Sequence, residues 1–309
     1  MTATSTVPEI ACFMPSGGDD LLGVVTFPHV EPRRVGVIVL AGGRYEQSAG
    51  RNGVSHRLAR SLSQLGFHVL RFDYHGVGDS TGVLNEFVLH KPFLGDLAAA
   101  VSELRRHGAE RFVLMGDCFG SRTALAAVET VEDLSALVLV SLPWRDLARS
   151  NRKAHIASSQ LSLGDYAKRG LSMRVLRNLA DASSRMAYRQ LAVAKLTQMA
   201  RRVADRIAGM DVEPWVSRRV LRQLDEVRKR KVRTLMLYGT GAAEDYTHDF
   251  EHVRTSAALS WLSAPDGPVD VQVLDQPVAG FRNLVSQDEV VAKATAWIDG
   301  VFAPLAEVA

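Results

Sequence analysis

The sequence is poor in cysteine, with two among 309 residues, Cys12 and Cys118. Two cysteines cannot form a disulfide framework, and free thiols are typical of a reducing compartment. No run of about 18 apolar residues is present, so no membrane-spanning helix is predicted. Residues 1–9 also lack the basic segment and apolar core of a signal peptide. These absences predict a cytoplasmic protein without a membrane span.

Several binding motifs are missing as well. The sequence contains neither a phosphate-binding P-loop nor the glycine pattern of a dinucleotide-binding turn. Its nine histidines do not share a metal-ligand spacing with cysteines or carboxylates. No nucleic-acid-binding module can be recognised. We therefore expect no cofactor, no metal and no nucleic-acid partner.

The charge is unevenly distributed. The net charge is only +3, yet residues 144–233 contain 22 lysines and arginines against 8 acidic residues. Such asymmetry indicates a second module with its own partner preference. The alternative is an ordinary solvated helical surface in an arginine-rich protein.

Outside that segment, apolar runs typical of strands alternate with helical patterns. Strands are expected at 10–15, 21–28, 35–40, 67–72, 112–116, 136–140, 234–239 and 269–274. Helices are expected at about 53–65, 91–107, 250–262 and 287–302, the last capped by Ser286. This alternation predicts an α/β fold with a doubly wound, mostly parallel sheet. In such sheets the chemistry lies at the carboxyl ends of the strands.

The alternation stops at Pro143. Residues 144–230 contain helical patterns and no convincing strand. We interpret them as a helical cap, or lid, inserted into one core domain made of residues 1–143 and 231–309.

One segment carries a catalytic signature. Gly116-Asp117-Cys118-Phe119-Gly120 links an apolar strand to a helix rich in small residues. This Gly-x-Cys-x-Gly pattern is typical of a nucleophile elbow, with cysteine in the usual place of serine. The glycines are needed because side chains on either side of so sharp a turn would collide with the flanking strand and helix.

Together with the elbow, the segment Gly66–Ser80, which reads GFHVLRFDYHGVGDS, resembles the α/β-hydrolase superfamily in its lidded, serine-aminopeptidase-like branch. The resemblance covers about 22–142 and 233–302. It implies that Cys118 is the nucleophile. It also implies an oxyanion hole formed by the backbone N–H groups of Phe119 and Gly43, in a substrate-binding loop that includes Gly42 and Arg44.

The resemblance places the acid of the triad after the strand that ends at Gly239. Asp245 is the best candidate there, and Glu244 is the next. Either residue could instead be an ordinary solvated carboxylate. The triad histidine is expected after the last strand, commonly within His-Gly-Phe, but this sequence has Ala279-Gly280-Phe281. The usual general base is therefore absent from its position.

Cysteine can react without that base. A free thiol has a pKa of about 8.5, and a helix N-terminus lowers it. His248 and His75 are possible substitutes for the missing histidine, although each could equally be a surface or structural residue.

The sequence thus predicts an enzyme of the thioesterase or transacylase type, acting on an acyl thioester or ester. The basic segment could attract an anionic carrier of the acyl group, such as coenzyme A or acyl carrier protein. One alternative is a lyase or cyclase that uses the same pocket for elimination or rearrangement in natural-product biosynthesis. The other is a catalytically silent binding protein.

Overall fold

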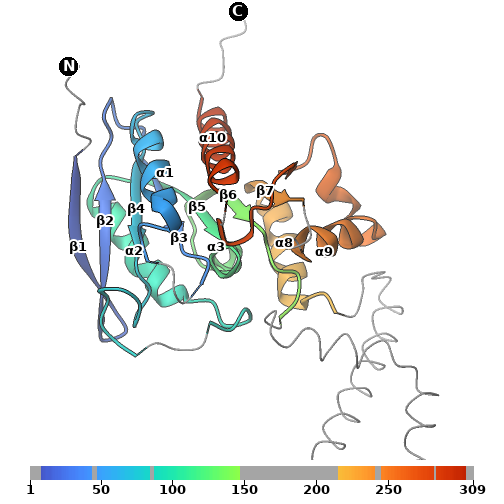
Figure 1. Cartoon of the computed structure of the whole chain (residues 1–309), viewed down its shortest axis with the longest axis horizontal. Coiled ribbons are helices and arrows are strands. Elements are labelled where there is room, and N and C mark those ends of the chain that lie inside the picture. The colour runs from blue at the N-terminus through green and yellow to red at the C-terminus, as the bar shows by residue number, and fades with distance from the viewer. Residues whose placement is uncertain are drawn as a thin grey trace, which may run out of the picture.

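A computed structural model of the chain describes residues 8–43, 47–83, 87–146, 215–240, 245–281 and 283–303. Its centre is one eight-stranded sheet with the order β1-β2-β4-β3-β5-β6-β7-β8 (Figure 1). The first two strands form an antiparallel hairpin, β2 pairs antiparallel with β4, and the remaining pairs are parallel. The strands are β1 (Glu9–Ser16), β2 (Asp19–Thr26), β3 (Val35–Leu40), β4 (His68–Phe72), β5 (Arg111–Asp117), β6 (Leu134–Val140), β7 (Arg233–Gly239) and β8 (Val269–Leu274).

Helices cover both faces of this sheet. On one face lie α1 (Val54–Ser63) and α10 (Leu284–Val301), which pack against each other and against the central strands. The other face carries α2 (Leu94–Arg106), α3 (Phe119–Ala126) and α8 (Arg218–Arg230). Strands β3 and β4 are buried along their whole length, because a strand covered on both faces has no solvated side. The predicted doubly wound α/β fold is confirmed.

The last helix begins earlier than predicted. It starts at Leu284, and its cap is Asn283, whose side chain accepts a hydrogen bond of 2.9 Å from the Val285 N–H. The prediction of Ser286 as the cap was wrong, because Asn283 is placed to satisfy one of the first unpaired N–H groups. Ser286 lies inside the first turn and donates its hydroxyl to the Asn283 carbonyl.

The segment after β7 also differs from the prediction of a single helix at 250–262. It forms α9 (Asp245–Arg254), followed by a 3₁₀ helix at Ala257–Ser263. Tyr246, Phe250 and Val253 recur at helical spacing and all pack on the core. This apolar stripe favours a helix from residue 245 onward. Asp245 and His248 therefore lie on a helix, where the sequence predicted a loop.

The boundaries of the cap stay a prediction, because residues 147–214 lie outside the described part. Of the predicted cap, the structure describes Trp144–Asp146 and Trp215–Arg230. Helix α8 buries Val220, Leu224 and Val227 in the same core cluster as Leu125 of α3. This part of the segment therefore contributes to the core of the sheet domain.

Candidate active site

The turn between β5 and α3 has the strained backbone expected of an elbow. Cys118 has φ 48° and ψ −106°, a region that costs a non-glycine residue about 1–3 kcal/mol. Its N–H donates to the Val140 carbonyl at 3.0 Å, and its own carbonyl accepts from the Arg122 N–H at 3.2 Å. These bonds hold the strained residue at the carboxyl edge of the sheet.

The two elbow glycines are required by close backbone approaches. A Cβ at Gly116 would lie 2.6 Å from the Ser121 nitrogen, and a Cβ at Gly120 would lie 2.9 Å from the Ala41 carbonyl oxygen. Both distances are below any normal contact, and the obstructing atoms belong to the backbone. The turn can therefore be built only with glycine on both sides of Cys118.

We expect Gly120→Ala to lower the free energy of unfolding by about 2–3 kcal/mol, because backbone atoms must move to admit the methyl group. Equilibrium urea unfolding followed by circular dichroism measures this loss. Gly95→Ala is the matched control, because Gly95 is exposed on α2 and a Cβ there meets only the Ser16 hydroxyl at 3.7 Å. That variant should be neutral or slightly stabilised. Equal effects of the two changes would contradict the packing argument.

The thiol has a partner that the sequence did not reveal. The Cys118 sulfur is half-buried and lies 3.5 Å from the phenol oxygen of Tyr246, on α9. No histidine within the described part of the chain hydrogen-bonds to this sulfur. Tyr246 was missed because it was assigned to a loop, and only its place in the first turn of α9 directs it toward the elbow.

The backbone N–H of Phe119, a predicted oxyanion donor, already makes a hydrogen bond within the chain. The Phe119 N–H donates to the Gly42 carbonyl at 3.2 Å, across the gap between the elbow and the loop after β3. An acyl oxygen bound at Phe119 would have to replace that carbonyl. A Cβ at Gly43 would meet no atom within 4 Å, so this residue lies in open space. Arg44 lies outside the described residues.

The two remaining positions of the predicted triad follow the neighbouring strands β7 and β8. Asp245 is the first residue of α9, and its side chain lies outside the described part. Ala279 begins a 3₁₀ turn, Ala279–Phe281, after β8. The next residue, Gly280, donates its N–H to the Asp117 carboxylate at 3.3 Å. The turn that carries Ala279 therefore abuts the elbow.

Neither alternative histidine hydrogen-bonds to the thiol. His248 is exposed on α9, with its ring 5.9 Å from that of His252. His75 binds the buried carboxylate of Asp96 through Nδ1 at 2.7 Å, and its backbone N–H contacts the same oxygen at 3.0 Å. This double contact gives His75 a structural role in the turn after β4.

Arg122, one turn after Cys118, is a second residue that the sequence did not single out. Its guanidinium is buried and donates to the carbonyls of Pro143 and Arg145 at 3.0 and 3.3 Å. It also binds the Asp146 carboxylate at 2.7 Å and the Ser217 hydroxyl at 3.4 Å. Arg122 on α3 therefore holds together the two ends of the inserted segment.

Burial affects the pKa of both Arg122 and Asp146. Burial lowers the pKa of the Arg122 guanidinium, and the attraction of Asp146 and of a Cys118 thiolate opposes that shift. Burial also opposes the charge of Asp146, but hydrogen bonds from Ser217 and Arg122 outweigh it and keep the pKa of this carboxyl below its usual value. Because arginine stays protonated in proteins, Arg122 contributes positive potential near the thiol.

Aromatic side chains also pack at the two ends of the inserted segment. The indole N–H of Trp144 donates to the Tyr238 hydroxyl at 3.0 Å, and the Phe250 ring stacks on Tyr238 with centroids 4.6 Å apart. Full burial raises the pKa of Tyr238, so its phenol stays neutral and accepts this bond. Arg145 binds Asp249 through two bonds of 2.8 and 2.9 Å.

The loop that carries Gly42 is anchored from β4. The buried Asp73 carboxylate accepts hydrogen bonds from the backbone N–H groups of Ser48 and Asp79. Burial raises the pKa of this carboxyl, against the effect of those two bonds. Asp73 thus ties the glycine-rich turn after β4 to the loop after β3. These bonds hold the loop after β3 beside the elbow.

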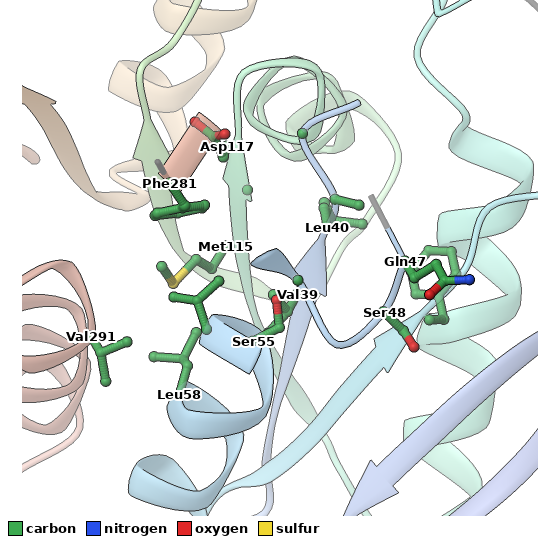
Figure 2. Close-up of a pocket in the computed structure, with 16 residues that line it drawn as sticks. Val39, Leu40, Gln47, Ser48, Ser55, Leu58, Met115, Asp117, Phe281 and Val291 are labelled. Atoms are coloured by element: carbon green, nitrogen blue, oxygen red, sulfur yellow. The ribbon is translucent and has the colours of Figure 1, made fainter. Parts of the chain in front are cut away.

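An apolar pocket lies beside the elbow, below the loop after β3. Its lining includes Asp117 but not Cys118. Figure 2 shows Asp117, Phe281 and Met115 along one side of it, and Leu40, Gln47 and Ser48 along the other. The pocket lies among side chains of the α1 and α10 face of the sheet, such as Leu58 and Val291, so it does not receive the thiol.

The described residues include neither a metal-binding cluster nor a helix that could span a membrane. They contain no cluster of three or more histidine, cysteine or acidic side chains able to hold a metal ion. No described helix has the length and apolar character needed to cross a membrane.

The fold and the elbow define an α/β hydrolase. The family model of the alpha/beta hydrolase fold matches residues 36–298, and the chain belongs to this family. No curated protein matches the chain.

Solved structures share the fold at low sequence identity. An esterase of Pyrococcus furiosus is 15% identical, with a TM-score of 0.57, and the match covers 96% of this chain and 92% of that one. A proline iminopeptidase of Mycobacterium smegmatis is 18% identical, with a TM-score of 0.55 and coverage of 95% and 99%. A haloalkane dehalogenase of Agrobacterium tumefaciens is 14% identical, with a TM-score of 0.53 and coverage of 95% and 97%. Since these three names denote different reactions, the fold alone does not decide the chemistry.

Proposed function

We propose that this chain is an acyl-transfer enzyme of the thioesterase or transacylase type, with Cys118 as its nucleophile. The observation that carries the proposal is the strained backbone of Cys118, which presents a half-buried thiol at the carboxyl edge of the sheet. Strain of this kind persists only where the surrounding structure enforces it, and it clusters at functional sites. The thiolate attacks the acyl carbon and forms an acyl-Cys118 thioester, and the leaving group departs with its electron pair.

Acylation requires a change at the loop after β3. In the structure the Gly42 carbonyl accepts the Phe119 N–H. That carbonyl and the Gly43 N–H belong to the same peptide group. Rotation of this peptide would release the Phe119 N–H and turn the Gly43 N–H toward the acyl oxygen. Glycine on both sides of the peptide makes the rotation inexpensive, so one movement would supply both oxyanion donors.

The missing imidazole biases the reaction toward thioester substrates. Departure of a thiolate depends less on protonation than departure of an alkoxide, whereas attack of water on the acyl enzyme needs a base. Transfer to another nucleophile is therefore favoured over hydrolysis. The cytoplasm, where a free thiol persists, is the compartment that suits this chemistry.

Charge supports the choice of the acyl carrier. Coenzyme A and acyl carrier protein are both anionic, and the segment 144–233 is strongly basic. Within the described part of that segment, Arg222 pairs with Glu129, and Lys229 pairs with Asp225. Attraction of an anionic carrier would therefore rest mainly on residues 147–214.

Two other functions fit the same fold. A lyase or cyclase could use the same edge of the sheet for elimination or rearrangement without a covalent intermediate. A binding protein could keep the fold and catalyse nothing. The absence of histidine from position 279 is compatible with either one.

Intact-protein mass spectrometry after incubation with acetyl- and octanoyl-coenzyme A separates these possibilities. We expect one acyl adduct on the wild type and on Cys12→Ala, and none on Cys118→Ala. The Cys12 control is suitable because this thiol lies in the hairpin, bonded to the Gly23 carbonyl at 3.7 Å, and burial raises its pKa.

The opposite results would each exclude a part of the proposal. No adduct on the wild type, or an undiminished adduct on Cys118→Ala, would remove the covalent mechanism. Turnover that persists in Cys118→Ala would indicate the lyase or cyclase. Binding without adduct or turnover would indicate the silent protein.

A further inference from the structure

We infer that Tyr246 is the proton-carrying partner of Cys118 and takes over part of the role of the missing histidine. The contact that carries this inference is the 3.5 Å approach of the phenol oxygen to the thiol sulfur. The two residues are 128 positions apart in the chain, and they meet because α9 follows β7 while the elbow follows β5. No family motif in this sequence marks Tyr246.

The direction of this hydrogen bond follows from ordinary acidities. A phenol has a pKa of about 10 and a thiol about 8.5, so the thiol ionises first and the phenol remains the donor. A hydrogen bond to the charged form favours that form. Tyr246 therefore stabilises the thiolate, as does the buried cation of Arg122.

The remaining charged groups around the elbow are already engaged with neighbours. From β5, the Asp117 carboxylate accepts the Gly280 N–H, and from α9 the Asp249 carboxylate binds Arg145. From α3, Arg122 supplies positive charge. The Tyr246 hydroxyl, by contrast, hydrogen-bonds to the sulfur itself. It is therefore placed to move a proton at the reacting atom.

The Cys118 thiolate adds to the acyl carbon, and the carbonyl oxygen becomes an oxyanion. When the carbon–sulfur bond of the substrate breaks, the leaving alkyl thiolate takes the electron pair. Because an alkyl thiolate is more basic than a cysteine thiolate and close in basicity to phenolate, it receives the phenol proton of Tyr246. The resulting phenolate then accepts a proton from the incoming alcohol, amine, thiol or water as that nucleophile attacks acyl-Cys118. Tyr246 ends the cycle protonated.

The first test needs no acyl substrate, so it is independent of the proposed function. In a Cys12→Ser background, the rate of alkylation of Cys118 by iodoacetamide is measured from pH 5 to 10 by intact mass. Tyr246→Phe keeps the ring and removes the hydroxyl, so we expect the midpoint of the pH profile to rise by about one unit. Tyr238→Phe removes a phenol that bonds Trp144, and its midpoint should not move. An unchanged midpoint in Tyr246→Phe would overturn the inference.

The second test addresses proton donation and rests on the proposed function. Single-turnover acylation is compared for an alkyl thioester, a poor leaving group, and an aryl thioester, a good one. Tyr246→Phe should slow the alkyl substrate about tenfold or more and the aryl substrate much less. Equal losses would reduce Tyr246 to a positioning residue. If neither substrate acylates the wild type while the alkylation midpoint still shifts, the proposed function fails and the thiol–phenol pairing stands.

Discussion

Replacement of Ala279 by histidine is expected to raise the hydrolysis of acyl-Cys118 by about 10²–10⁴-fold, the usual contribution of a positioned general base. The structure supports the choice of position. The turn Ala279–Phe281 follows β8, and its Gly280 N–H is bonded to the Asp117 carboxylate. A Cβ at Gly239 would lie 2.7 Å from the Val278 nitrogen, so β7 also confines this turn. An imidazole there would be a general base for the attacking water at the position that alanine now occupies.

The pH profile distinguishes a true base from a general structural effect. With histidine at position 279, hydrolysis should rise with pH through a limb near about 6.5, the ordinary range of imidazole. Ala279→Gln is the control, because it adds polar bulk without a base, and it should not show that limb. Release of free acid after single-turnover acylation measures the rate. If Ala279→His hydrolyses no faster than Ala279→Gln, then position 279 does not face the acyl enzyme.

Replacement of Arg122 by methionine is expected to cost about 3 kcal/mol in the free energy of unfolding. Methionine retains most of the volume but leaves the Asp146 carboxylate and the carbonyls of Pro143 and Arg145 without their donor. Removal of one partner from a buried pair costs about 3–5 kcal/mol. The lower end applies because the Asp146 side chain is 41% exposed.

The matched control for this change is Arg222→Met. Arg222 pairs with Glu129 through a bond of 2.8 Å, but its side chain is 66% exposed. Such surface pairs contribute little, so this variant should unfold at nearly the wild-type urea concentration. Similar losses in the two variants would show that burial does not set the value of the Arg122 contacts. Linear extrapolation of urea unfolding curves gives both numbers.

Much of the fold could be predicted because its signals are local. Strands β3 and β8 match the predicted bounds. Strand β3 was predicted as a bounded apolar run because it is covered on both faces. Prediction was weaker after β7, where α9 begins at Asp245 and the predicted helix began at 250. There the apolar positions are sparse, and docking on the core fixes where the helix starts.

In the candidate site, too, local features could be predicted and contacts between distant segments could not. The sequence by itself determined the elbow, because two glycines around one residue in a strand–turn–helix context reflect sterics within a few positions. It also determined that alanine precedes Gly280 after the last strand. Only the tertiary structure decided that Tyr246 contacts the Cys118 sulfur, that Arg122 joins the ends of the insertion, and that Gly42 occupies the Phe119 N–H. These contacts join segments far apart in the chain, and they depend on strand order and on the rotation of each helix, which no local pattern encodes.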